Sequence, residues 1–133
     1  MGWMFNGCHK LKEIKGVNKF NTSNVTQMSF MFNGCSKLKE IKGINKFNTG
    51  KVISMKAMFN NCGELEYLDL SNFNTSTVDD MEGMFNKCNK LKYLNLLNFS
   101  INCETINMLT FSSKKDCQFI TNNKDLLNLY NSS

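Results

Sequence analysis

Cysteines are the residues of this chain whose type most readily suggests chemistry. Six in 133 residues could form disulfides or bind zinc. Four of them, Cys8, Cys35, Cys62 and Cys88, follow one another at steps of 27, 27 and 26 residues. No CxxC pair or histidine cluster accompanies them, so the usual spacing of a zinc site is missing. We therefore expect no metal or cofactor, and expect these cysteines to be buried free thiols.

The regular spacing also argues against disulfides among these four residues. One cysteine in each of several stacked repeats would lie roughly 4.8 Å from the next with parallel Cβ vectors, which suits a disulfide badly. Cys103 and Cys117 fall outside this register. They could form one disulfide near the C-terminal end or remain unpaired, and the spacing leaves both alternatives open.

The other ionisable residues form no catalytic arrangement. His9 is the single histidine, and no equivalent position of another repeat carries one. Asp79 and Asp80 are adjacent carboxylates, but we expect them at the start of a helix, where negative charge is favourable anyway. No glycine-rich phosphate loop occurs. The sequence therefore predicts a protein that is not an enzyme.

A binding surface has better support. In LEYLDL (Leu65–Leu70), apolar residues alternate with residues that would face solvent. Alignment of the repeats places the outward residues in columns, with Tyr67 beside Tyr93. Tyrosine is favoured on surfaces that bind proteins or sugars, although it also simply suits an exposed strand. The candidate binding residues are Glu13, Glu40, Tyr67, Tyr93, Lys15, Lys42, Asp69 and Asn95, beside a further column of Lys12, Lys39, Glu66 and Lys92.

The element that must position these residues is an internal repeat. MFNGCHKLKEIKGVNKFNT (residues 4–22) returns almost unchanged as residues 31–49, and two looser copies follow. A period of 26–27 residues lies in the range of leucine-rich repeats. One unit cannot bury its apolar positions alone, whereas stacked units bury them as continuous ladders. The aligned columns include Met28, Met55, Met81 and Met108; Phe20, Phe47, Phe73 and Phe99; and Leu11, Leu38, Leu65 and Leu91.

Each coil is predicted to contain one short parallel strand and one short helix. The LxxLxL pattern of residues 65–70 indicates the strand. In VDDMEGMFNKC (Val78–Cys88), apolar residues three and four apart indicate a helix. We expect about four coils over residues 1–110 and a C-terminal cap over residues 111–133. Met1 falls in the methionine column, so we expect a coil truncated at its N-terminal side, whose open edge would favour end-to-end association.

The motif MFxxCxxLxxLxLSNFNTSxVxxM, best seen over residues 58–81, carries a family resemblance. It resembles the 26-residue repeat of bacterial surface proteins, grouped with the BspA-like leucine-rich repeats and found in mycoplasma-type surface lipoproteins. The resemblance implies an α/β fold, a right-handed solenoid on a cell surface that serves in binding or adhesion, and no catalytic residues. GKV at residues 50–52 and SINCETINM at residues 100–108 depart from the pattern.

Composition narrows the choice of partners. Residues 1–56 hold ten lysines and two acids, whereas residues 57–133 hold six lysines and nine acids. The basic half can attract anions, although a lysine-rich solvated face would look the same. Arginine is absent, which disfavours nucleic-acid recognition. No run of residues is long and apolar enough to span a membrane.

The function we expect is that of a cell-surface or secreted repeat protein, which binds a protein or glycan on an extracellular surface. Two alternatives stay open at this point. One is an intracellular leucine-rich-repeat scaffold or effector that binds a protein partner. The other is a structural spacer without any ligand.

Overall fold

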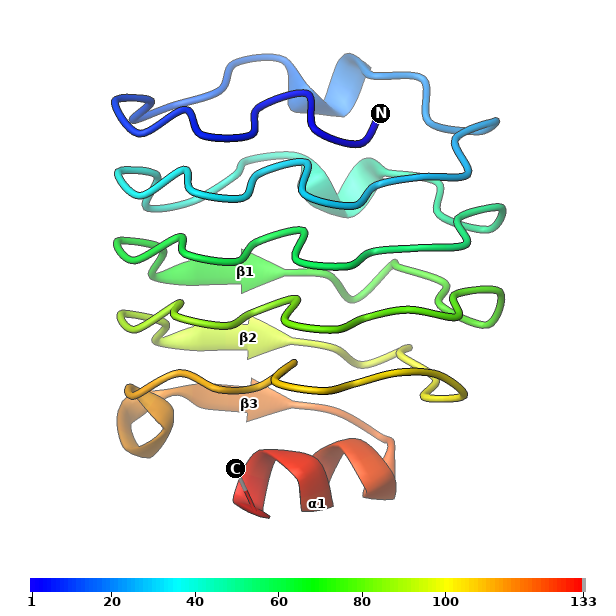
Figure 1. The fold of residues 1–133 in the computed structure, drawn as a ribbon, viewed down its shortest axis with the longest axis vertical. Coiled ribbons are helices and arrows are strands. Elements are labelled where there is room, and N and C mark those ends of the chain that lie inside the picture. The colour runs from blue at the N-terminus through cyan, green and yellow to red at the C-terminus, as the bar shows by residue number, and fades with distance from the viewer. Residues whose placement is uncertain (133) are drawn as a thin grey trace.

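The structure is a computed structural model, and it describes residues 1–132. The chain passes through a series of stacked coils, with the N-terminus in the first coil and helix α1 below the last (Figure 1). The strands β1 (Tyr67–Asp69), β2 (Tyr93–Asn95) and β3 (Gln118–Ile120) form an open parallel sheet in that order. Three 3₁₀ turns, η1 (Val17–Lys19), η2 (Ile44–Lys46) and η3 (Lys114–Asp116), and the helix α1 (Lys124–Ser132) complete the elements. The predicted α/β class and the parallel pairing of the strands are confirmed, whereas the prediction of one strand in every coil is wrong, because among the described residues the first two coils contain no regular strand.

Hydrogen bonds between coils define the stack. On the side away from the sheet, every second backbone N–H donates to a carbonyl of the next coil: Met28 to Ser54 at 3.0 Å, and Phe30 to Lys56 at 2.9 Å. On the sheet side, β1 pairs with β2 so that Tyr67 lies opposite Tyr93. Equivalent residues of successive repeats are therefore neighbours in space.

The core consists of identical side chains stacked on one another, as the repeat predicts. Phe32 stacks on Phe59 with ring centroids 5.6 Å apart, and Phe59 on Phe85 at 5.8 Å. Phe47 and Phe73 belong to a second ladder with a spacing of 6.5 Å. The methionine, leucine and cysteine columns of the inner coils are fully buried between these ladders.

The predicted helix over Val78–Cys88 is wrong. This segment consists of turns, although its apolar residues are buried as expected. The N–H groups of Met81 and Phe85 donate to Glu104 and Met108 of the next coil instead of bonding four residues back. Gly83 and Lys87 adopt positive φ values of 62° and 61°, which a right-handed helix cannot contain. The prediction of one helix per coil is therefore also wrong.

A buried threonine fastens each coil to the next at the asparagine-rich turn. The Thr49 hydroxyl donates to the Asn74 carbonyl at 2.9 Å and accepts from the Asn74 N–H at 2.8 Å. Thr75 makes the same pair of bonds with Ser100, at 3.0 and 2.8 Å. These hydroxyls supply hydrogen-bond partners to part-buried backbone groups of the next coil.

The C-terminal segment both continues and covers the stack. β3 pairs with β2, Gln118 lying opposite Tyr93, so the sheet extends into the region predicted as a cap. Asn123 caps α1 by accepting from the N–H groups of Asp125 and Leu126. Leu126 is fully buried against the core. The division at residue 110 stays a prediction.

Candidate binding face

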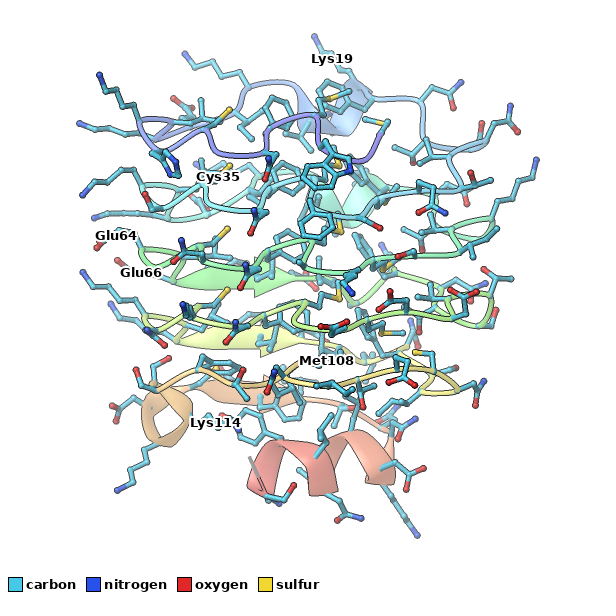
Figure 2. The ribbon with its side chains drawn as sticks, in the orientation of Figure 1. Lys19, Cys35, Glu64, Glu66, Met108 and Lys114 are labelled. Carbon is cyan, nitrogen blue, oxygen red and sulfur yellow. The ribbon has the colours of Figure 1, made fainter. Side chains whose placement is uncertain are left out.

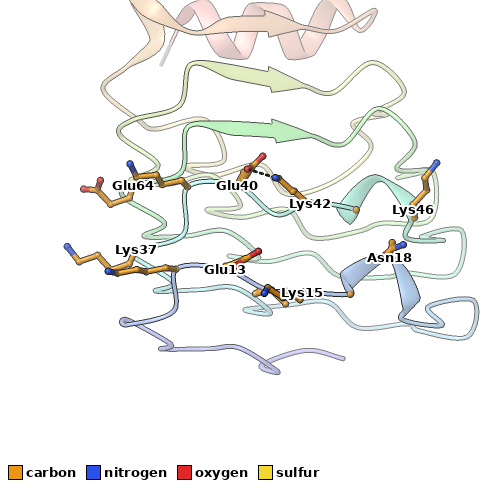
Figure 3. A pocket seen from close by; sticks show the side chains of 13 residues that line it. Glu13, Lys15, Asn18, Lys37, Glu40, Lys42, Lys46 and Glu64 are labelled. Atoms are coloured by element: carbon orange, nitrogen blue, oxygen red, sulfur yellow. Dashed lines mark ion pairs between the residues drawn. The ribbon is translucent and has the colours of Figure 1, made fainter.

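The sheet face brings together most of the predicted binding residues. Glu40 lies beside Tyr67 through a parallel bridge, and Tyr67 pairs with Tyr93. The neighbouring column places Asp69 opposite Asn95. Glu13, Lys15 and Lys42 lie in the two preceding coils, where the same columns continue without a regular strand (Figure 3). The repeat alignment thus gave the correct neighbours.

The two tyrosines form a stacked pair at the centre of this face. Their ring centroids are 4.5 Å apart, and Tyr67 is 47% exposed. Asn95 Nδ2 donates to the Tyr93 hydroxyl at 3.2 Å, which fixes that ring from the adjacent column. Partial desolvation, with smaller contributions from Tyr93 and Asp69, raises the pKa of Tyr67 above its usual value. At neutral pH Tyr67 therefore presents a neutral hydroxyl that can donate a hydrogen bond.

A groove of about 970 Å³ lies across the first two coils (Figure 3), and Glu40, one of its lining residues, is bridged to Tyr67. Six lysines and three glutamates supply all its charged groups, an excess of three positive charges. The side chain of Ile14 and the backbones of Gly16 and Gly43 add uncharged surface. The charged lining residues are Lys12, Glu13, Lys15, Lys37, Lys39, Glu40, Lys42, Lys46 and Glu64.

The groove lies on the first two coils, which are 27 residues long and thus one residue longer than the third. In these coils, η1 and η2 follow glycines in the left-handed conformation, Gly16 at φ 75° and Gly43 at φ 86°. A Cβ atom at Gly43 would lie 2.8 Å from the Asn18 Cβ, so only glycine fits there. Gly16, Asn18, Gly43 and Lys46, which lie in and beside these turns, line the groove, so the two longer coils form one of its walls.

Acidic residues of the third coil are engaged by lysines of the fourth. Lys90 Nζ contacts Glu64 at 2.8 Å, and Lys92 Nζ contacts Glu66 at 2.7 Å. These hydrogen bonds hold the pKa values of Glu64 and Glu66 below their usual range. Both glutamates project from the same edge of the stack (Figure 2). Their charge is largely matched locally, so the lysines of the first two coils dominate the groove.

The repeat cysteines are free thiols, as predicted. Cys62 Sγ lies 3.1 Å from the carbonyl oxygen of Phe32 in the previous coil, and Cys35 makes the equivalent contact with Phe5. Burial raises the pKa of Cys35 to about 12. Cys103 and Cys117 are also free thiols, so the unpaired alternative describes them in this structure. Within residues 1–132, no group of three histidine, cysteine or acidic side chains is placed to hold a metal ion.

Comparison with known proteins identifies one family. The family model described as "Mycoplasma protein of unknown function, DUF285" matches residues 1–123. The chain belongs to the DUF285 family. No curated protein and no solved structure matches the chain. The part that belongs to DUF285 thus includes the tyrosine pair, the groove and β3, and it ends one residue before α1 begins.

Sequence reasoning missed several groove residues of this DUF285 chain. Lys37, Lys46, Glu64 and Asn18 line the groove but were not among the predicted binding residues. The surplus of lysine in residues 1–56 was the available signal, and it was also consistent with an ordinary solvated face.

In the described part of the chain, no helix has the length and apolar character required to cross a membrane.

Proposed function

We propose that this DUF285 chain is a non-enzymatic binding module of a cell-surface protein. It would be a right-handed solenoid of the BspA-like leucine-rich-repeat type, possessing a sheet face that contacts an extracellular protein or glycan. The observation that carries the proposal is the stacked tyrosine pair, with Tyr67 exposed and Tyr93 half-buried, beside a large, charged groove. Paired aromatic rings with polar tips are the kind of group that dominates binding energy at interfaces.

The physical role of the stack in this proposal is display. Backbone bonds and apolar ladders fix each coil on the next, so the outward residues are held in a regular array. Little backbone entropy therefore remains to be lost when a partner binds such an array. Of the two alternative functions, an intracellular scaffold would use the same face to bind a cytoplasmic partner. A structural spacer would have no binding face.

Localisation is tested by antibody labelling of intact source cells, with and without permeabilisation, combined with external protease treatment. Labelling of intact cells that disappears after protease treatment is the expected result. Labelling only after permeabilisation would contradict the surface proposal and favour an intracellular scaffold.

Binding is tested by screening the purified chain against panels of extracellular matrix proteins and glycans. The variant Tyr67→Ala/Tyr93→Ala should lose any interaction found, while keeping its coil-to-coil core. The matched control is Ile53→Ala/Ile106→Ala, which removes two exposed apolar side chains from a different part of the surface. Retention of binding by the tyrosine variant would show that the sheet face is not the contact surface.

A further inference from the structure

The lysines of the groove are mostly without acidic partners. Lys42 pairs with Glu40 at 3.4 Å and Lys39 lies 3.9 Å from Glu66. For Lys12, Lys15 and Lys46, no carboxylate lies within 4 Å among the residues the structure describes. All six groove lysines are exposed. Lysines that line one groove and have no acidic partner in the protein favour an anionic ligand.

The groove also contains three glutamates, whose carboxylates would repel a ligand that carries only negative charge. Glu13 and Glu40 occupy the column that leads to Tyr67, and Glu64 lies at the edge of the groove (Figure 3). Phosphate chains and acidic peptides bring few donors for these carboxylates, and their negative charges would be repelled. A ligand that carries both anionic groups and hydroxyl groups satisfies lysines and glutamates together.

Tyr67 is not itself a lining residue, but it lies beside Glu40, which lines the groove, and adds an exposed aromatic ring there. One face of its ring lies on Tyr93, at 4.5 Å. Because the rings stack along the column, the other face is directed toward the preceding member, Glu40, which lines the groove. Among the described residues no second aromatic ring covers that face. Since Tyr67 is 47% exposed, part of its ring is available to the apolar face of a sugar ring.

We propose that this groove binds a chain of acidic sugars, with sulfate or carboxylate groups on the lysines, hydroxyl groups on Glu13 and Glu40, and one sugar ring on Tyr67. The inference rests on the proposed function, because it names the ligand class of the sheet face. A nucleic acid is less suited, since the stacked tyrosines leave a single ring face and the chain contains no arginine for base recognition.

The test is calorimetric titration of the full chain with four probes: a heparin-derived oligosaccharide, a neutral dextran oligosaccharide, poly-glutamate and inorganic polyphosphate. We expect the heparin fragment to bind more tightly than the other three. Lys12→Gln/Lys15→Gln should weaken its binding about tenfold. Lys115→Gln/Lys124→Gln, which removes the same charge from exposed lysines near the C-terminus, should leave it unchanged.

The tyrosine is tested separately from the charge. Tyr67→Ala should weaken binding of the heparin fragment about fivefold, and Tyr67→Phe should restore it, because Phe keeps the ring face. Melting temperatures of all variants show whether each one is folded. Rescue by Phe would not occur if Tyr67 merely supplied a hydroxyl, so failure of Tyr67→Phe to restore binding overturns the sugar-stacking contact.

Other outcomes separate this inference from the proposed function. Equal affinity for heparin, poly-glutamate and polyphosphate would overturn the sugar assignment and leave a general anion-binding face. Absence of heparin binding, together with tyrosine-dependent binding of a matrix protein or neutral glycan, would overturn the acidic-sugar ligand but support the sheet face as a binding surface. If neither tyrosine nor lysine variants change any interaction found in the screens, both proposals fail.

Discussion

Tyr67 lies flat against Tyr93, with ring centroids 4.5 Å apart and ring planes within 7° of parallel. The contact joins equivalent positions of two successive repeats, whose backbones are paired in register through β1 and β2. Stacking of equivalent residues in successive repeats therefore builds both the buried ladders of phenylalanine and this tyrosine pair on the surface.

The tyrosine pair should contribute measurably to stability. Cross-strand aromatic pairs are worth about 0.5–1.5 kcal/mol beyond the area they bury. A double-mutant cycle of Tyr67→Ala and Tyr93→Ala, measured by urea unfolding, should give a coupling energy in this range. A coupling energy near zero would mean that the rings stack without stabilising each other in solution.

The conformation of Gly83 should make it intolerant of a side chain. Its φ of 62° lies in the left-handed region, and the nearest atom to an added Cβ is the Asn86 Cβ, at 3.9 Å. Gly83→Ala is therefore expected to reduce the free energy of unfolding by about 1–2 kcal/mol through backbone strain, not through a clash. Thermal or urea unfolding of the purified variant measures this loss.

Gly63 is the matched control, because its φ is outside the left-handed region and an added Cβ would meet no atom within 4 Å. Gly63→Ala should be neutral, or stabilise the protein by about 0.4–1 kcal/mol by restricting the unfolded chain. Equal losses for the two variants would contradict the left-handed assignment of Gly83.

Replacement of the buried Thr49 should weaken the contact between two successive coils. Thr49→Val keeps the shape of the side chain but removes the hydroxyl that bonds both backbone groups of Asn74. Leaving these groups without their partner should reduce the free energy of unfolding by about 1–3 kcal/mol. Thr26→Val, at an exposed position, should change it by less than about 0.5 kcal/mol. An equally small effect of Thr49→Val would argue that water replaces the lost bonds.

The buried thiols should resist alkylation in the native protein. Burial raises the pKa of Cys35 from 9.0 to about 12, so at pH 8 its thiolate fraction is lower by about a thousandfold. Desolvation also raises the pKa of Cys88 to about 12. Peptide mass spectrometry after brief iodoacetamide treatment should show modification at the half-buried Cys8 well before Cys35 or Cys88.

The pH dependence of the alkylation gives a second readout. Since the raised pKa values keep the thiols neutral, labelling of Cys35 should stay slow up to about pH 10 and rise only as the pH approaches 12. Unfolding in urea should make all six cysteines reactive at pH 8. Rapid native labelling of Cys35 would show that the coils open readily.

The repeat alignment alone located the core and the outward columns. Phe32, Phe59 and Phe85 stack, and Tyr67 lies beside Tyr93, because a constant period places equivalent residues one above another whatever the local backbone does. The apolar spacing of Val78–Cys88 did not predict its conformation. A helix and a stack of turns both bury residues three or four apart, and the choice depends on partners in the next coil.

The sequence by itself determined the period, the identity of the buried ladders, the free repeat cysteines and the order of the tyrosine column. Only the tertiary structure decided that backbone N–H groups donate between coils, that Gly83 and Lys87 turn the chain through left-handed conformations, and that a groove opens beside Tyr67. The physical reason is that periodicity fixes which residues become neighbours. Hydrogen bonds between coils, and the left-handed glycines that precede η1 and η2 in the first two coils, determine the shape of the surface that these neighbours form.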